Sequence, residues 1–362
     1  MPKTNILGFS KTQLESFFAS IGESRFRATQ VLKWIHQFGA NDFLDMTNIS
    51  QGLRGRLQEL VEICEPKVIY QSDSNDGTRK WIIQVDGGNS VETVLIPDGK
   101  RATLCISSQV GCALDCSFCA TGKQGFNRNL TAAEIIGQVR IAIKSFGSMH
   151  PNEPRRVTNV VLMGMGEPLL NFAAVTAAIS LMLDDNAYNL SKRRVTLSTA
   201  GLVPAIDKLA EVSDVSLAIS LHAANDKLRD QLVPLNRKYN IDALMDACNR
   251  YLNRLDDKRV ITMEYTMIDG INDQLHQAHE LVCVLQRVPC KLNLIPFNPF
   301  SGTSYRCSPQ PQIEAFQQVL REAGIVTTIR ATRGNDIDAA CGQLVGRVQD
   351  RTQRTIKLAN AN

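Results

Sequence analysis

The sequence predicts a mixed α/β protein that is built around a partial, open (β/α)6 barrel. Three observations indicate this fold class. After residue 98, short apolar segments alternate with amphipathic helical patterns, and such alternation forms a parallel sheet with right-handed crossovers. Six strand and helix units can be recognised, fewer than the eight that close a complete barrel. Polar or glycine-rich residues follow most of the strand candidates, which is where parallel α/β proteins bind their ligands.

Residues 1–66 are expected to form a helical accessory domain. Apolar side chains recur there at helical spacing in three stretches, at Leu14, Phe17 and Phe18, at Phe26, Val31, Leu32, Trp34, Ile35 and Phe38, and at Leu53, Leu57, Leu60 and Val61. The same region carries cations at Arg25, Arg27, Lys33, Arg54 and Arg56. These cations suit the phosphates of RNA, but an ordinary solvated helix face explains them equally well.

A β-hairpin segment is expected between the two domains, at residues 67–97. Apolar and polar residues alternate there with the period of two that is typical of strands, as at Trp81, Ile83 and Val85. Turn sequences at 75–77 and 86–88 divide the segment into short antiparallel strands. The last strand carries Glu92, a carboxylate that lies shortly before the barrel in sequence.

The barrel core is expected at residues 98–345. Strand candidates fall near 102–107, 157–163, 194–198, 215–220, 259–266 and 291–296, with a further strand at 325–330. Thr131 and Glu134 form a capping-box sequence at the start of the first helix. The remaining residues, 346–362, are expected to form a basic tail with cations at Arg347, Arg351, Arg354 and Lys357.

Three cysteines after the first barrel strand indicate a metal site. Cys112, Cys116 and Cys119 form a C-x3-C-x2-C array, and no fourth cysteine or histidine stands at ligand spacing. Such a triplet suits a [4Fe-4S] cluster that is held through three irons and leaves the fourth iron open. The array would also be compatible with a zinc site, for which Cys105 and His150 are the nearest additional ligands, with a disulfide framework, or with chance clustering among ten cysteines.

The array, with Phe118 before its last cysteine, resembles the signature of radical S-adenosylmethionine (SAM) enzymes. The surrounding motifs narrow this resemblance, and they occupy residues 109–112, 119–122, 164–168, 220–223 and 340–342. Together they are similar to the family of dual-specificity ribosomal RNA and transfer RNA adenine-C2 methyltransferases, over about residues 10 to 350. The resemblance implies a barrel of the radical SAM type, one [4Fe-4S] cluster, and two SAM molecules per turnover.

The resemblance also implies the residues that bind these cofactors. The metal ligands would be Cys112, Cys116 and Cys119. The SAM pocket would consist of Gly166, Glu167, Ser198, Ser220, Leu221, His222 and Asn298. Glycine at positions 164 and 166 allows the backbone to approach a ligand closely. For His222 alone, a structural histidine satisfied by hydrogen bonds is the ordinary interpretation.

Three catalytic residues follow from the same resemblance. Carbon 2 of adenine is electron-poor and has no lone pair, so polar methyl transfer from a sulfonium is blocked there. Cys341 would carry the methyl group as S-methylcysteine and form a covalent protein–RNA intermediate, and Cys105 would release the product through a transient disulfide with Cys341. Glu92 would accept the proton from the attacked carbon. Without the resemblance, the ordinary interpretation of Cys105 is a small buried residue, and that of Glu92 is a solvent-facing strand residue. Small residues around Cys341 suggest a mobile, accessible loop.

The expected partners are 23S rRNA in its peptidyl-transferase region, tRNA at the adenosine 3′ to the anticodon, and a reducing electron donor such as flavodoxin. The chain starts without a secretory leader, and no apolar run reaches membrane-spanning length. Ten cysteines in a reducing compartment are thiols or metal ligands. We therefore expect a cytoplasmic monomer without a membrane contact. The net charge of +4 does not by itself indicate nucleic acid.

Two other functions remain open. A C8-adenine 23S rRNA methyltransferase of the antibiotic-resistance type would use the same set of cysteines, although the longer N-terminal module favours carbon 2. A non-catalytic RNA-binding module with a structural iron–sulfur or zinc site would not cleave SAM.

Overall fold

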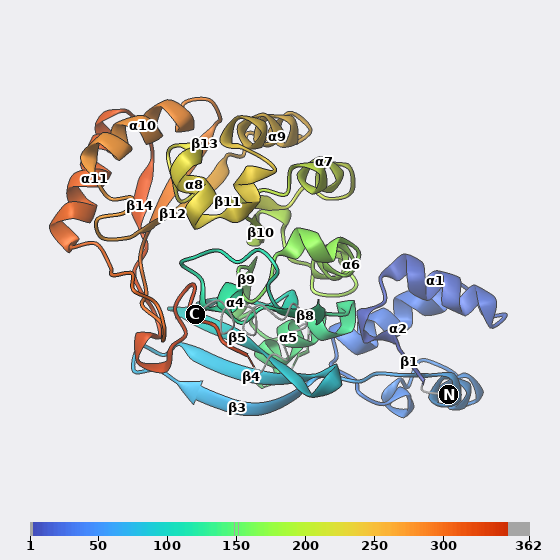
Figure 1. Ribbon diagram of the computed structural model, residues 1–362. Helices are drawn as coiled ribbons and strands as arrows, with labels where there is room; N and C mark the ends of the chain where they lie inside the picture. Colours follow the sequence, from blue (N-terminus) through green and yellow to red (C-terminus); the bar gives the residue numbers. More distant parts are fainter. Residues whose placement is uncertain (1–2, 148, 151, 347–362) are drawn as a thin grey trace.

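The computed structural model describes residues 3–147, 149–150 and 152–346 (Figure 1). The basic tail expected at 346–362, with Arg347, Arg351, Arg354 and Lys357, therefore lies outside the described residues except for Gly346. Within the described part, no helix is both long enough and apolar enough to cross a bilayer.

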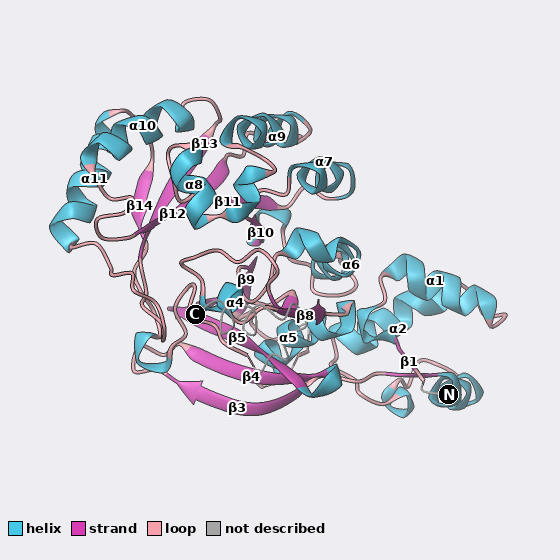
Figure 2. Ribbon diagram, viewed as in Figure 1, coloured by secondary structure: helices cyan, strands magenta, loops and turns pink. Residues whose placement is uncertain are grey.

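The centre of the molecule is a ten-stranded sheet with the strand order β14-β13-β12-β11-β10-β9-β6-β5-β4-β3. Seven neighbouring strands are parallel, and they are β6 (Arg101–Cys105), β9 (Val157–Leu162), β10 (Val195–Thr199), β11 (Ser216–Ser220), β12 (Ile261–Met267), β13 (Cys290–Pro296) and β14 (Thr327–Ile329). The helices between them are α5 (Ala132–Lys144), α6 (Phe172–Leu183), α7 (Val203–Val212), α8 (Asp226–Leu232), α9 (Ile241–Asn253), α10 (Leu275–Leu285) and α11 (Gln310–Glu322). The strands curve without closing, and the helices line the outside (Figures 1 and 2). The expected partial barrel is confirmed.

The segment at 67–97 differs from the expected hairpin linker. It forms β3 (Lys67–Asp73), β4 (Arg79–Val85) and β5 (Asn89–Asp98), which extend the same sheet in antiparallel order. Asp98 and Arg101 pair across the turn between β5 and β6. Because β5 pairs with β6, the first barrel strand is not left as an open sheet edge. The turn at 98–101 is therefore a chain reversal inside one sheet.

The two faces of the sheet differ in chemistry. Side chains alternate along each strand, so residues that pair across the sheet share a face. One face is apolar and buried, with residues such as Leu104, Val160, Leu197, Ile219, Met263 and Leu294. The strand register places Cys105, Ser198, Ser220 and Glu264 together on the opposite face. The polar face continues onto β5 and β4, where Glu92 and Lys80 lie on it.

The N-terminal residues form the expected helical module. Its helices are α1 (Lys11–Ser20), α2 (Phe26–His36) and α3 (Gln51–Leu60), and a small parallel pair joins β1 (Thr4–Asn5) to β2 (Val61–Glu62). Short 3-10 helices connect elements along the chain, at Ile6–Gly8, Phe43–Asp45, Asp86–Gly88, Pro168–Asn171, Lys192–Arg194, Pro234–Arg237 and Asn335–Ile337. Of the cations expected to grip RNA, Arg56 forms an ion pair with Glu23.

One buried side chain anchors this module to the barrel. Arg140 of α5 is fully buried, and its Nη2 donates hydrogen bonds to the carbonyls of Gly39 and Ala40, both at 2.8 Å, and to Asn41 Oδ1 at 2.7 Å. The same guanidinium contacts the Glu65 carboxylate and the Ile35 carbonyl. A single arginine therefore satisfies several backbone acceptors at the domain junction.

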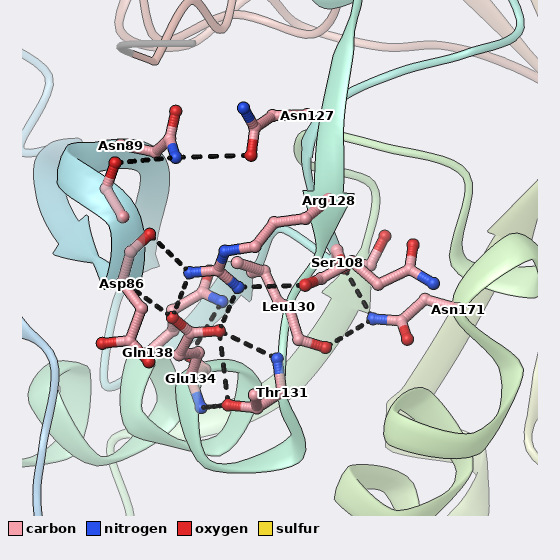
Figure 3. A network of polar contacts seen from close by, with 12 residues as sticks. Asp86, Asn89, Ser108, Asn127, Arg128, Leu130, Thr131, Glu134, Gln138 and Asn171 are labelled. Atoms are coloured by element: carbon pink, nitrogen blue, oxygen red, sulfur yellow. Dashed lines mark hydrogen bonds and ion pairs between the residues drawn. The ribbon is translucent and has the colours of Figure 1, made fainter. Parts of the chain in front are cut away.

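A polar network holds the chain between β6 and the cysteine loop (Figure 3). Gln138 of α5 accepts the Ser107 amide at 2.8 Å and donates to the Ser107 carbonyl at 2.9 Å. Asn171 donates to the Ser108 carbonyl at 2.8 Å. The predicted capping box at Thr131 and Glu134 is confirmed. These side chains fix the backbone just before β7 (Gln109–Gly111).

Candidate active site

The three cysteines of the predicted array lie on a loop that leaves β7 and leads into the short helix α4 (Ala120–Lys123) and the strand β8 (Phe126–Asn129). Cys112, Cys116 and Cys119 are free thiols, and all three line one cavity of about 130 Å³ at the carboxyl ends of the barrel strands. Burial raises the pKa of the Cys116 thiol and of the Cys119 thiol. Because buried thiolates need a positive partner, this donor set fits an iron–sulfur cluster.

The described residues contain no group of three or more His, Cys, Asp or Glu side chains arranged around a single metal ion. His150, considered above as a zinc ligand, lines a different cavity of about 540 Å³ together with His36 and Tyr188. The second additional zinc ligand considered, Cys105, does not line the cavity of the three cysteines.

The structure brings six of the seven expected SAM-pocket residues to this cavity. They are Gly166, Glu167, Ser198, Ser220, His222 and Asn298. Leu221 is fully buried and is not among the residues that line the cavity. Its amide donates to the Glu264 carbonyl at 3.0 Å, and its own carbonyl accepts from Arg229 at 3.0 Å. Leu221 thus joins the ends of two neighbouring strands by backbone contacts.

The glycines after β9 are required by a close contact within the protein. A Cβ at Gly166 would lie 2.4 Å from Gln109 Cβ, and the φ of Gly166 is +99°. A Cβ at Gly164 would lie 2.7 Å from the Ile106 carbonyl. The glycine-rich loop therefore packs directly on the segment before the cysteine loop, a reason beyond the ligand approach that the sequence suggested.

Glu167 and His222 are both held by buried hydrogen bonds. The Glu167 carboxylate accepts the amides of Ala200 at 2.8 Å and Leu169 at 3.1 Å, and burial raises its pKa. His222 Nδ1 accepts the Thr266 amide at 3.0 Å, and burial lowers the His222 pKa to about 3. The imidazole is therefore neutral and carries its proton on Nε2, which can donate to a ligand.

Cys341 lies where two cavities meet. It lines the cavity of the three cysteines and also a second cavity of about 220 Å³. Cys105 lies nearby on β6, close enough that a charge on Cys341 raises its pKa. Burial raises the pKa of Cys341 to about 11 and that of Cys105 to about 12. Both cysteines are free thiols in this structure.

The loop that carries Cys341 was expected to be mobile, but many hydrogen bonds hold it. The Gly342 carbonyl accepts the Ala120 amide at 2.8 Å, and the Leu344 carbonyl accepts the Thr121 hydroxyl at 2.7 Å. Asn298 donates to the Cys341 carbonyl at 3.3 Å. The segment after β14 runs toward the edge strands before it returns to the centre (Figure 1). The Cys341 loop is thus tied to the cysteine loop on one side and, through Asn298, to the expected SAM pocket on the other.

Glu92 is buried, with 2% of its surface exposed, so it is not a solvent-facing strand residue. Its carboxylate accepts the Val345 amide at 3.1 Å and pairs with Lys80 Nζ at 3.4 Å. Burial raises the pKa of Glu92, and Lys80 opposes that shift. Glu92 lines neither cavity beside Cys341. It touches the Cys341 loop through Val345, and Lys80 also donates to the Asp338 carbonyl of that loop at 3.3 Å.

Sequence reasoning missed Lys80, Glu264 and Arg330. Glu264 lines the cavity of the three cysteines, and Arg330 lines the second cavity with Cys341. A signal for Glu264 was present in β12, where polar Thr262, Glu264 and Thr266 alternate with buried apolar residues.

Comparisons with known proteins identify the family of the chain. Residues 4–63 match the ribosomal RNA large subunit methyltransferase N-terminal domain, and residues 106–282 match the radical SAM superfamily. The dual-specificity RNA methyltransferase RlmN of Marinobacter nauticus is 63% identical over 98% of this chain and 95% of its own length. The proteins with the same description from Marinomonas sp. and Pseudomonas fluorescens are 62% and 60% identical over 98% of this chain, and the matches cover 96% and 92% of those proteins.

A solved structure agrees as well. The crystal structure of a radical SAM methyltransferase from Sphaerobacter thermophilus superposes with a TM-score of 0.86 at 41% identity, over 94% of this chain and 99% of that one. By fold, site and sequence, the chain belongs to the RlmN family of dual-specificity RNA methyltransferases, which are radical SAM enzymes.

Proposed function

We propose that this chain methylates carbon 2 of adenosine in 23S rRNA, in the peptidyl-transferase region, and in tRNA, at the adenosine 3′ to the anticodon. One observation carries the proposal: a single cavity is lined by the three thiols of the cysteine loop, by the expected SAM-binding residues, and by Cys341. The relatives named above are described as dual-specificity RNA methyltransferases, and residues 4–63 match a ribosomal RNA methyltransferase domain, which supports two kinds of RNA substrate. A target base must leave its stack to reach such a cavity, which favours loops and unpaired nucleotides.

Two groups of residues would bind the cofactors. Cys112, Cys116 and Cys119 would hold one [4Fe-4S] cluster, and Gly166, Glu167, Ser198, Ser220, His222 and Asn298 would enclose SAM. The methyl group and the one-electron chemistry come from these cofactors, with two SAM molecules per turnover. The neutral His222 offers an Nε2 proton to SAM, and the Glu167 carboxylate holds the backbone around it.

Cys341 carries the transferred carbon to the base and remains bound to the RNA through a thioether. Once the new carbon–carbon bond has formed, the C–H bond at carbon 2 breaks: the Glu92 carboxylate accepts the proton, and the remaining electron returns to the one-electron chemistry that the cofactors would supply. Since Glu92 lies outside both cavities, its contact with Val345 must open for this step.

The second thiol, Cys105, releases the methylated RNA from Cys341. The Cys105 thiolate forms a sulfur–sulfur bond with Cys341 while the bond between the Cys341 sulfur and the RNA-bound carbon breaks. The electron pair of the broken bond goes to that carbon, which takes up a proton and becomes the methyl group. The two cysteines are thereby oxidised to a disulfide, and an external thiol reductant restores them.

The surroundings of the reaction belong to the same proposal. We infer a monomer that works in the cytoplasm and receives electrons from a reduced donor such as flavodoxin. We also infer that residues 1–66 form an RNA-binding accessory domain, that 67–97 adds the edge strands, and that 98–345 forms the catalytic core.

The test is nucleoside mass spectrometry after reaction of the anaerobic, cluster-loaded chain with 23S rRNA fragments and tRNA. We expect 2-methyladenosine with the native chain and none with Cys341→Ala, whereas Cys105→Ala should accumulate a covalent protein–RNA adduct. Cys283→Ala is the matched control, because Cys283 is an exposed thiol on α10. Detection of 8-methyladenosine would replace the proposal with the C8 activity, and a chain that binds RNA without cleaving SAM would replace it with the non-catalytic module.

A further inference from the structure

Two charged residues with no role so far line the two cavities that share Cys341, Glu264 the first cavity and Arg330 the second. Glu264 is on β12, opposite Ser220 of β11, and Arg330 directly follows β14. The Arg330 amide donates to the Leu294 carbonyl at 2.8 Å, which keeps Arg330 in line with the sheet. Its Nη1 lies 3.9 Å from Glu264 Oε1, and the side chains are 30% and 5% exposed.

The Glu264 carboxylate is held by one hydrogen bond, but it could accept more. Its Oε2 accepts the Ser198 hydroxyl at 3.2 Å. Its Oε1 is buried and has no hydrogen-bond partner among the described residues. At 3.9 Å the contact with Arg330 is an ion pair without a hydrogen bond. The positive charge of Arg330 is therefore only partly neutralised by Glu264.

Arg330 lies near both thiols, because its charge lowers the pKa of Cys105 and of Cys341. Arg330, Cys341 and Thr103 line the second cavity. Thr103 stands two residues before Cys105 on β6, so the two side chains share a face of the sheet. The cavity that Arg330 lines therefore lies along the same face of β6 that carries the resolving thiol.

Cys105 needs a cation if it is to act as a nucleophile. Its burial raises its pKa to about 12, so almost none of it is thiolate at neutral pH. The titratable and charged groups that face it are Cys341, Arg330 and Glu264, and the Glu92–Lys80 pair lies on the same face of the neighbouring strands. At the release step of the proposed function, Cys341 is a neutral thioether, so its charge no longer opposes ionisation of Cys105. Arg330 is then the positive group among the three neighbours.

We propose that Arg330 is a positioning residue for product release and that its guanidinium stabilises the thiolate of Cys105. Glu264 orients Arg330 and partly neutralises its positive charge. This inference rests on the proposed function, but its first experiment, thiol labelling, requires no RNA methylation. It assigns opposite effects to the two residues, because loss of Arg330 removes the stabilising charge and loss of the Glu264 charge leaves Arg330 uncompensated.

The first experiment measures thiol reactivity. The full, cluster-loaded chain with Cys341→Ala, which cannot form the disulfide, is treated with iodoacetamide at pH 8 under anaerobic conditions, and modification of the Cys105 peptide is followed by mass spectrometry. We expect Arg330→Gln to slow this modification by about tenfold, the effect of one pKa unit, and Arg330→Lys to restore most of the rate. Glu264→Gln should speed it up. Arg333→Gln is the matched control, because Arg333 lines the same cavity and is 48% exposed.

The outcomes separate a charge effect from a change of shape. Equal rates for the native residue and Arg330→Gln would overturn the inference, and so would an Arg330→Lys rate as low as that of Arg330→Gln. If Arg330→Gln does not load its cluster, Glu264→Gln and Arg330→Lys are each compared with the chain that keeps the native residue. A faster Glu264→Gln together with a near-native Arg330→Lys supports the charge effect, and a Glu264→Gln rate at or below the native one overturns it.

A second readout follows the reaction itself. With RNA, SAM and reductant, Arg330→Gln in the chain with native Cys341 should accumulate the protein–RNA adduct about tenfold over the native chain, and Arg330→Lys should not. If the native chain forms neither adduct nor methylated base, the proposed function fails while the labelling result still stands. If methylation proceeds and Arg330→Gln builds up no adduct, the assignment of Arg330 fails alone.

Discussion

Replacing Arg140 with methionine should weaken the attachment of the N-terminal module to the barrel, and it should lower the free energy of unfolding more than a substitution of an exposed arginine does. The guanidinium donates hydrogen bonds to Gly39, Ala40 and Asn41 at 2.7 to 2.8 Å and contacts Glu65. Methionine keeps the unbranched apolar stem but is shorter, and it leaves the carbonyls of Ile35, Gly39 and Ala40 without this donor. Asn41 Oδ1 and the Glu65 carboxylate keep their contacts with Lys144. Each unsatisfied buried acceptor costs about 1–3 kcal/mol, and Glu65, whose side chain is 20% exposed, recovers part of its hydration. We therefore expect a loss of about 3–5 kcal/mol in the free energy of unfolding.

The assay uses the two tryptophans of the chain. Trp34 lies on α2, beside the Ile35 carbonyl that Arg140 contacts, and Trp81 lies on β4. In a Trp81→Phe background, Trp34 fluorescence during guanidinium denaturation reports the module itself. The control is Arg250→Met, because Arg250 is 51% exposed in its ion pair with Asp207 and such pairs contribute at most about 1 kcal/mol. If Arg140→Met shifted the Trp34 transition no more than Arg250→Met, the proposed anchoring would be refuted.

Two further predictions concern pH and the cofactor pocket. Burial and Arg140 lower the pKa of His36 to about 3, whereas a histidine in the unfolded chain titrates near 6.5. Between these two pH values the unfolded chain therefore binds more protons than the folded chain. The free energy of unfolding should fall by up to about 1.4 kcal/mol per pH unit as the pH drops from 6.5 toward 3. Denaturation at pH 5 and pH 7 should show a smaller difference in His36→Gln than in the native chain, and identical differences would contradict the assignment. Gly166→Ala should lower the affinity for SAM at least tenfold in calorimetric titrations, because the new methyl group meets Gln109 at 2.4 Å. Gly302→Ala, at a positive φ with nothing within 4 Å, should bind SAM normally, and equal affinities for the two variants would disprove the packing argument.

Much of the fold could be predicted because parallel strands covered by helices carry a strong apolar pattern. The expected strand at 157–163 is β9 (Val157–Leu162), and the one at 291–296 is β13 (Cys290–Pro296). The sequence does not predict the pairing of β5 with β6, because the turn residues at 98–101 are equally typical of a boundary between domains. Turn residues show that the chain reverses, but they do not show whether the strands on either side pair with each other.

The site was predictable to the extent that it consists of short motifs. The cysteine array and the loop at Gly166 are visible in the sequence, and the structure brings both to one cavity. Glu264 and Arg330 belong to no sequence motif. Only the register of strands β12, β13 and β14 brings them close to each other and to Cys341. Lys80 was missed for the same reason, because its partner Glu92 is on the next strand.

The hydrogen bonds from Ala120 and Thr121 to the Cys341 loop have a practical consequence for how inactivation is interpreted. Both donors directly follow the last cysteine of the array, so under the proposed function, oxygen damage that removed iron from these thiols would also disturb the loop of the proposed methyl carrier, Cys341. Alanine variants of Cys112, Cys116 or Cys119 therefore combine two defects in one phenotype. Gentle chelation of the iron, followed by refilling, separates them: activity that returns in step with iron belongs to the metal, and any shortfall belongs to a displaced carrier loop.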